Sequence, residues 1–201
     1  MKYIFLKNKK GLTLTELIVA TVMIAIVMVG VAAFTFAVKS IQGTSRKASI
    51  TSMRLAAVMS KLRKDAMLAV GDINNLGIVS NNTGDDRGLC FRHDADNDPA
   101  TYTGDQWVCY VTYGTGDTGL RVCEGLASAD TDCGQAGPPN DKQLIELTSK
   151  NYFSISLDGQ GRLAELQITL TARDDSSAVA DPLENPEYTL TTKVFPVGHS
   201  W

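Results

Sequence analysis

One stretch near the N-terminus limits what this chain can fold into more than any other. Residues 17–38 form an apolar run that contains no charged residue. A helix of this length spans the hydrocarbon core of a membrane, which takes about 20 apolar residues. Basic residues precede the run at Lys2, Lys7, Lys9 and Lys10. Because positively charged flanks stay on the cytoplasmic side, we expect a single-pass segment whose N-terminus lies inside.

A single acidic residue stands at the start of this apolar segment. Glu16 directly precedes the run, about one turn into the expected helix. A carboxylate inside a membrane span costs about 2.5–3.5 kcal/mol on insertion scales. Its presence therefore requires either a function or a partner of opposite charge, because a buried charge is tolerated when it is paired.

The residues around Glu16 resemble the N-terminus of type IV prepilins, a family that includes pilins and type II secretion pseudopilins. The matching features are a short Lys-rich leader that ends at Gly11, followed by Leu-Thr-Leu-Thr-Glu and a long apolar helix. The resemblance implies cleavage after Gly11 by a prepilin peptidase and N-methylation of Leu12, where the family most often has Phe. It also implies that the Glu16 carboxylate pairs with the N-terminal amine of a neighbouring subunit.

Two simpler interpretations of this N-terminus are an ordinary secretory signal and a plain signal anchor. A secretory signal has an apolar core of about 7–15 residues and a small-residue cleavage site, for which residues 30–32 offer only a weak candidate. A signal anchor explains the apolar run and the lysines, but neither the Gly11 junction nor Glu16. We therefore favour the prepilin interpretation.

Charge divides the remainder of the chain into two parts. Residues 39–64 contain seven basic residues and no acidic one, and we call them the basic segment. Residues 72–201 contain 20 acidic residues against 8 basic ones, a net charge of −12. Such an acidic part argues against nucleic-acid binding. The basic segment favours contact with the acidic part of another copy or with anionic lipid, and a solvated helix face is the alternative.

Residues 39–71 are expected to continue the helix. One apolar residue recurs at every seventh position, at Ile41, Ala48, Leu55, Leu62 and Ala69. Such a stripe packs against a sheet or forms a coiled coil. Because the run is short, we expect it to pack on the chain's own C-terminal part. Gly30 and Gly43 are weak points at which this helix can bend.

Beyond residue 71 the pattern changes to strands. Turn signals at residues 71–75 end the helix. Aromatic and β-branched runs predict strands at residues 89–92, 107–113, 120–123, 144–147, 152–157, 163–172 and 188–197. Residues 114–119 fit G-x-G-x-x-G, but a strand follows them instead of a helix, so we interpret them as a hairpin connection. Residues 158–161 predict a second hairpin turn.

The sequence thus predicts an α+β, pilin-like fold, in which a long N-terminal helix with a transmembrane lower half packs on an antiparallel β-sheet head. The expected parts are a leader at 1–11, a transmembrane and filament-core helix at 12–38, its amphipathic continuation at 39–71, and an extracytoplasmic head at 72–201. The resemblance implies a place in the bacterial inner membrane and then in a periplasmic or cell-surface filament. It implies other pilin or pseudopilin subunits, the peptidase and the membrane as partners.

All four cysteines, Cys90, Cys109, Cys123 and Cys133, follow the membrane segment. We expect the head to lie in an oxidising compartment, where four cysteines suggest two disulfides. Of the three pairings we favour Cys90–Cys109 and Cys123–Cys133, because each closes a local loop. A zinc site is the weaker alternative, since C-x2-C spacing is absent.

Acidic residues alternate at Asp94, Asp96 and Asp98, and Asp105 stands at the twelfth place of a calcium-loop pattern. Hard cations prefer such clustered carboxylates. However, Pro99 occupies the place where that loop needs glycine, and Asp105 is shorter than the expected Glu. We therefore favour an exposed acidic loop, with calcium as the alternative, and expect no other cofactor.

Nothing in the sequence supports catalysis. The only histidines are His93 and His199, and neither a nucleophile-elbow pattern nor a metal-binding His pair occurs. We expect a non-enzyme. The resemblance implies a minor type IV pilin with a priming or tip role, because a head of 130 residues is bulkier than a repeating major subunit of that family typically needs. A type II secretion pseudopilin and a single-pass membrane-anchored binding module are the alternatives.

Overall fold

The computed structural model describes residues 13–72, 74–82, 86–96, 98, 101–113, 118–129, 141–159, 162–182 and 185–195. One helix, α1 (Leu14–Leu68), is followed within these residues by eight strands. The chain divides into two compact units, Met1–Ser45 and Arg46–Trp201, and α1 continues from the first into the second.

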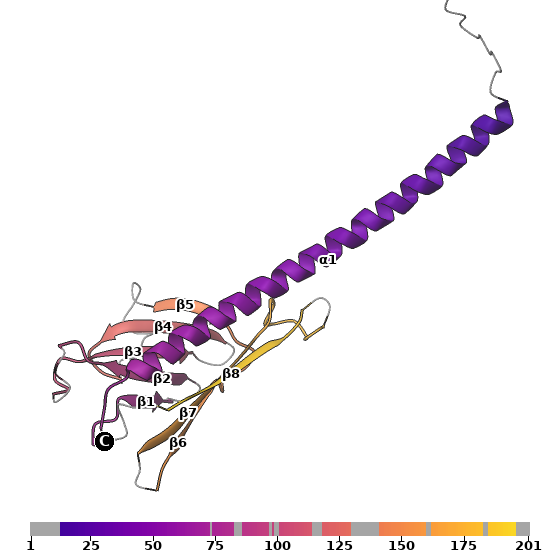
Figure 1. Ribbon diagram of the computed structural model, residues 1–201. Coiled ribbons are helices and arrows are strands. Elements are labelled where there is room, and N and C mark those ends of the chain that lie inside the picture. Colours follow the sequence, from indigo (N-terminus) through magenta and orange to yellow (C-terminus); the bar gives the residue numbers. More distant parts are fainter. Residues whose placement is uncertain are drawn as a thin grey trace, which may run out of the picture. The chain divides into compact units, whose positions relative to one another are not determined.

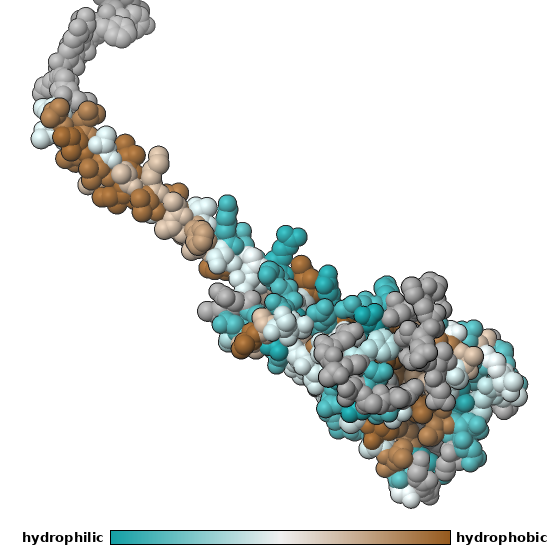
Figure 2. Space-filling model, turned by 180° about the vertical axis from the view of Figure 1, so that it is seen from behind, coloured by the Kyte–Doolittle hydropathy of each residue, from teal (hydrophilic) through white to brown (hydrophobic). Residues whose placement is uncertain are grey.

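In the first unit, α1 presents apolar side chains to its surroundings on all sides. Large hydrophobic residues between Leu14 and Phe36 are 52–78% exposed, and Figure 2 shows the nearly continuous hydrophobic surface of this segment. The helix runs through Gly30 and Gly43 without interruption, so the predicted weak points do not break it. Among the described residues, α1 alone is long and apolar enough to cross a membrane.

The second unit contains two antiparallel sheets. The first sheet has the order β1-β2-β3-β4-β5, with β1 at Ile78–Asn81, β2 at Arg87–His93, β3 at Gln106–Thr112, β4 at Gly119–Leu126 and β5 at Asp141–Glu146. The second sheet has the order β6-β7-β8, with β6 at Phe153–Leu157, β7 at Leu163–Ala172 and β8 at Tyr188–Val194 (Figure 1). The α+β fold is therefore confirmed, although the strands form two sheets and not the single sheet we predicted.

The core joins the second half of α1 to both sheets. The predicted heptad stripe is buried where it meets the sheets: Leu55 and Leu62 are 0% exposed and Ala69 is 2% exposed. Ile41, at the start of the stripe, is 68% exposed. The core contribution of α1 consists of Leu55, Val58, Met59, Leu62 and Ala66. The basic segment thus presents its apolar stripe to the chain's own head, as expected.

The central strands β2 and β3 of the first sheet are buried on both faces. Successive side chains of a strand point to opposite faces of the sheet. On one face of β2, Leu89 and Phe91 pack in the core with α1. On the other face, Cys90 packs in a second apolar cluster with Cys109, Cys123 and Leu126. The second sheet is half-buried instead: on β7 every second residue from Leu166 to Ala172 is fully buried, in an alternating pattern.

The predicted strands exist, with ends shifted by up to three residues. The prediction missed β1, since these four residues follow directly on turn signals and form an edge strand paired only with β2. The helix ends at Leu68 instead of residue 71. A backbone hydrogen bond of 2.8 Å from Asp158 N–H to the Arg162 carbonyl closes the predicted β6–β7 connection. Residues 114–117 of the predicted β3–β4 connection lie outside the described part, and the two strands pair as expected.

Candidate functional site

The start of α1 forms a capping box between Thr13 and Glu16. The Oε2 atom of Glu16 accepts hydrogen bonds from the Thr13 backbone N–H at 2.9 Å and from the Thr13 hydroxyl at 2.8 Å. In return, the Glu16 N–H donates to the Thr13 Oγ1 at 3.3 Å. This reciprocal pair satisfies backbone donors that the first turn of a helix otherwise leaves open. Thr13 is therefore the N-cap, which explains why α1 begins at Leu14.

The capping box gives Glu16 a second role that our sequence interpretation missed. The signal was present as Thr-x-x-Glu before an apolar run, but we considered only the charge of Glu16. Both Thr13 bonds use Oε2, and Oε1 receives no hydrogen bond from the described residues. The arrangement orients the carboxylate toward the N-terminal end of the helix, where the helix dipole also favours a negative charge. Within the described part of the chain, Oε1 is thus left for a further donor.

The predicted processing residues, Gly11 and Leu12, lie outside the described residues. Cleavage between them and methylation of Leu12 stay predictions. Thr13 is described, and it would be the second residue of the processed chain. The capping box would therefore lie entirely within the processed chain.

Three of the four cysteines lie on neighbouring strands of the first sheet. Cys90 on β2 is directly opposite Cys109 on β3, and Cys109 is in turn opposite Cys123 on β4. The predicted Cys90–Cys109 disulfide is present, with a Cα–Cα distance of 4.0 Å. Cys123 is also disulfide-bonded, but its predicted partner Cys133 lies outside the described residues, so that pairing stays a prediction.

The four aspartates of the calcium-loop pattern do not lie together. Carboxylate oxygens of Asp94, Asp96 and Asp105 lie within 4.8 Å of one another. Asp98 is outside this group and accepts a hydrogen bond of 3.2 Å from the Thr101 hydroxyl. Our expectation of an exposed acidic loop is wrong for Asp105, which is only 6% exposed. Burial follows from its position directly before β3, beside the buried guanidinium of Arg92.

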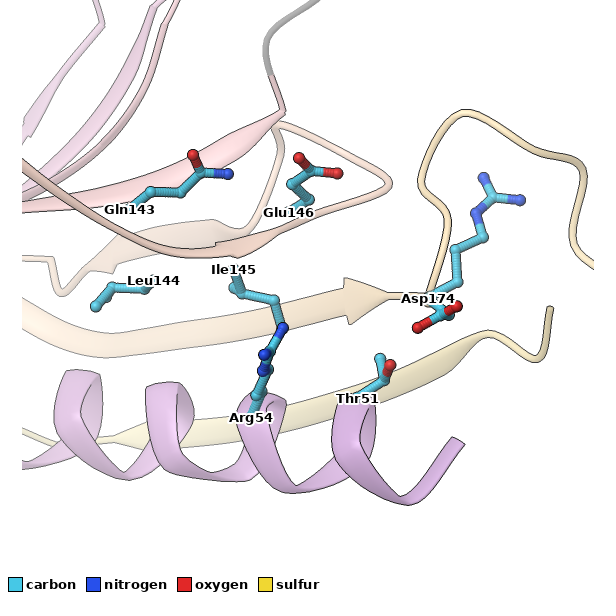
Figure 3. Close-up of a pocket in the computed structure, with 8 residues that line it drawn as sticks. Thr51, Arg54, Gln143, Leu144, Ile145, Glu146 and Asp174 are labelled. Atoms are coloured by element: carbon cyan, nitrogen blue, oxygen red, sulfur yellow. The ribbon is translucent and has the colours of Figure 1, made fainter. Parts of the chain in front are cut away.

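A polar recess of about 650 Å³ lies between α1 and β5. Figure 3 shows Arg54 extending from α1 toward β5, with Asp174 at one end of the recess. Its carboxylates already have partners on the chain, since Asp174 pairs with Lys47 at 3.2 Å and Glu146 accepts a hydrogen bond of 2.8 Å from Ser176. The lining residues are Thr51, Arg54, Gln143, Leu144, Ile145, Glu146, Arg173 and Asp174. They include neither a histidine nor a cysteine. No sequence pattern predicted this recess.

Comparison with known proteins identifies the N-terminal segment. A family model described as the prokaryotic N-terminal methylation motif matches residues 6–32, which include Gly11, Leu12 and Glu16. No curated protein and no solved structure matches the chain. The motif indicates a structural subunit rather than an enzyme, and the long apolar helix is compatible with membrane anchoring. The chain therefore carries a type IV prepilin-like, class III signal peptide, and this motif supports a precursor of the pilin or pseudopilin type.

Proposed function

We propose that this precursor is a minor type IV pilin, which enters a pilus or pilus-like filament after cleavage between Gly11 and Leu12. The observation that carries the proposal is the position of Glu16. It lies within the methylation motif, in the first turn of a helix that has no other charged residue before Lys39. A lone carboxylate at the end of an apolar helix is suited to binding one cation as that helix leaves lipid.

Cleavage changes the charge of the N-terminus in the way that assembly requires. Before cleavage, the four lysines of residues 1–11 hold the N-terminal end on the cytoplasmic side of the membrane. Cleavage removes these lysines and leaves a single amine on Leu12. The N-terminal amine of one subunit then binds Oε1 of Glu16 on its neighbour, while Oε2 of the same carboxylate keeps its hydrogen bonds from Thr13. The pair is neutral, so the apolar helices can exchange lipid contacts for contacts with one another.

The basic segment and the acidic head support a second contact between subunits. Part of the basic segment is used within the chain, because Lys47 pairs with Asp174 and Lys61 with Glu124. The remaining basic residues, among them Arg63 and Lys64, are exposed on α1. Opposite charges favour association of this segment with the acidic head of an adjacent subunit. The bulk of the head supports a priming or tip role rather than that of the repeating subunit.

The mass of the N-terminal peptide from native membranes and filaments tests the proposal. We expect a chain that begins at Leu12 and carries one methyl group, in the filament fraction as well as in the membrane. The unprocessed precursor, made in a strain that lacks the prepilin peptidase, is the control and should stay in the membrane. A chain that begins at Met1 and never leaves the membrane would instead indicate an anchored binding module.

A further inference from the structure

The β2–β3 hairpin brings two acidic residues face to face at the end of the first sheet. The last paired residues of the hairpin are His93 on β2 and Gln106 on β3. Asp94 follows His93 and Asp105 precedes Gln106, so these two aspartates occupy the next opposed positions. Like charges at opposed positions destabilise a sheet. A counter-charge between them would remove this repulsion.

A third carboxylate completes a group with the dimensions of a cation site. Carboxylate oxygens of Asp94, Asp96 and Asp105 all lie within 4.8 Å of one another. Calcium–oxygen distances are about 2.3–2.6 Å, so two ligands on opposite sides of one ion are about 4.6–5.2 Å apart. All three oxygens can therefore touch the same ion. The Asp98 N–H donates to Asp96 Oδ1 at 3.0 Å, which holds the Asp96 carboxylate in place.

The burial of Asp105 is a second and independent observation that points to a cation at this group. Its side chain is about 1% exposed, and neither of its carboxylate oxygens has a hydrogen-bond partner in the described part of the chain. The same holds for the buried Oδ1 atom of Asp94. Burying a carboxylate without hydrogen bonds is costly unless an opposite charge or a metal ion compensates it. Both orphaned groups belong to the three-carboxylate group.

Arg92 compensates only part of this negative charge. Its Nε atom is 3.7 Å from Asp105 Oδ2, which is an ion-pair distance but too long for a hydrogen bond. Its N–H groups donate instead to the backbone carbonyls of Val70 at 3.2 Å and Asn75 at 2.5 Å. Its guanidinium also lies over the Tyr102 ring, 3.9 Å from the centroid. One guanidinium beside three carboxylates leaves two negative charges, which one divalent cation would balance.

We propose that Asp94, Asp96 and Asp105 bind a calcium ion. Calcium accepts six to eight oxygen ligands in flexible geometry, so water and backbone carbonyls would complete a shell begun by three carboxylates. Magnesium requires near-octahedral geometry and retains most of its water, which a group of converging carboxylates suits less well. The bound ion would fasten the β2–β3 loop to the end of the sheet. This proposal concerns the head alone and does not depend on filament assembly.

Thermal unfolding of the full chain in detergent tests the site, with calcium chloride as the probe. A ligand that binds only the folded state raises the Tm as its concentration exceeds the Kd. Extracellular calcium modules have a Kd of about 0.1–1 mM. At 100 times the Kd we expect the Tm to rise by about 5–10 °C and the rise to saturate. Magnesium chloride at the same concentration controls for ionic strength and should give a smaller shift.

Three variants and one control make the test specific to these residues. Asp94→Asn, Asp96→Asn and Asp105→Asn should each lower the calcium affinity by at least about tenfold. Asp98→Asn removes the same charge from the same loop, yet it should retain the full calcium-dependent shift. If Asp105→Asn fails to fold because its side chain is buried, Asp96→Asn still tests the site. Asp96 is exposed, and asparagine retains an oxygen that can accept the hydrogen bond from the Asp98 N–H, so this variant should fold.

Three results would overturn the proposal. The first is an unchanged Tm in the wild-type chain up to 100 mM calcium, about 100 times the weakest Kd of such modules. The second is an equal shift with magnesium and calcium in every variant, which would reflect screening of the acidic head. The third is a loss of the shift in Asp98→Asn as large as that in Asp96→Asn, which would show that total loop charge matters and not these three ligands.

Discussion

Glu16→Gln separates the two roles that the structure gives to Glu16. Glutamine retains an oxygen that can accept hydrogen bonds from Thr13, so the capping box stays intact. The variant lacks the negative charge, so the N-terminal amine of a neighbour loses its partner in the apolar core. We therefore expect normal folding and cleavage, but weak incorporation into filaments.

The expected size of the defect follows from the location of the pair. Removing one partner of a buried ion pair costs about 3–5 kcal/mol, because the other charge is left uncompensated. At about 1.4 kcal/mol per factor of ten, even the lower figure reduces incorporation more than 100-fold. Loss of the helix cap alone costs about 0.5–2 kcal/mol. The two roles therefore predict defects of clearly different size.

Quantitative immunoblots of sheared filaments and of membranes, taken as a ratio, measure incorporation. Thr13→Val is the complementary variant, since it removes the capping hydroxyl and keeps the Glu16 charge. Its incorporation should fall far less than that of Glu16→Gln. Thr13→Ser keeps the hydroxyl and should behave as the wild type, and the N-terminal mass of each variant verifies cleavage. Normal incorporation of Glu16→Gln beside defective Thr13→Val would refute the charge-pairing argument and leave Glu16 as a helix cap.

Three further predictions concern the stability of the head, measured by unfolding in detergent. Leu62→Ala should lower the free energy of unfolding by about 2–5 kcal/mol, since the Leu62 side chain is 0% exposed. Ile41 belongs to the same stripe but is 68% exposed, so Ile41→Ala should lower it by less than about 0.5 kcal/mol. Equal losses in the two variants would contradict the packing of the stripe. Replacing both Cys90 and Cys109 by Ala removes a disulfide that joins residues 19 positions apart, and it should lower the free energy of unfolding by about 3 kcal/mol. An unchanged Tm would show that this disulfide does not stabilise the head. Burial, together with the hydrogen bond that the Tyr110 hydroxyl donates to Asp65, raises the pKa of Tyr110 above its unfolded value of about 10. The contribution of Tyr110 to the free energy of unfolding is therefore complete below pH 10 and falls by about 1.4 kcal/mol per pH unit above pH 10. Tyr110→Phe should make stability fall less steeply at alkaline pH, and an unchanged slope in this variant would contradict the prediction.

The sequence predicted those parts of the fold that depend on local patterns. The uncharged run fixed the apolar half of α1, and the seven-residue repeat identified Leu55 and Leu62 as core residues before any sheet was known. The strand predicted at residues 163–172 matches β7 to the residue. The strand β1 was missed because its stability comes from pairing with β2 and burial of Ile78, which are tertiary contacts.

The sites were predictable only to the extent that their residues are adjacent in sequence. The Thr13–Glu16 capping box carries a local signal and was available from the sequence. The burial of Asp105 carries no such signal, because it depends on the register of β2 and β3 and on the position of Arg92 between backbone carbonyls. The twelve-residue calcium-loop pattern therefore includes three aspartates that lie together, Asp94, Asp96 and Asp105, and a fourth, Asp98, that lies outside the carboxylate group.

In the proposed filament, Glu16 is neutralised by the newly exposed amine of an adjacent subunit. Carbodiimide treatment of intact filaments with a reagent that enters apolar regions converts a carboxylate in contact with an amine into an amide. Mass spectrometry should then find the peptide containing Glu16 joined to the mature N-terminus of a neighbouring subunit, and Glu16→Gln should abolish this link. Filaments that contain the chain with Glu16 unlinked, or with residues 1–11 still attached, would contradict the pairing of Glu16 with a neighbour's N-terminal amine.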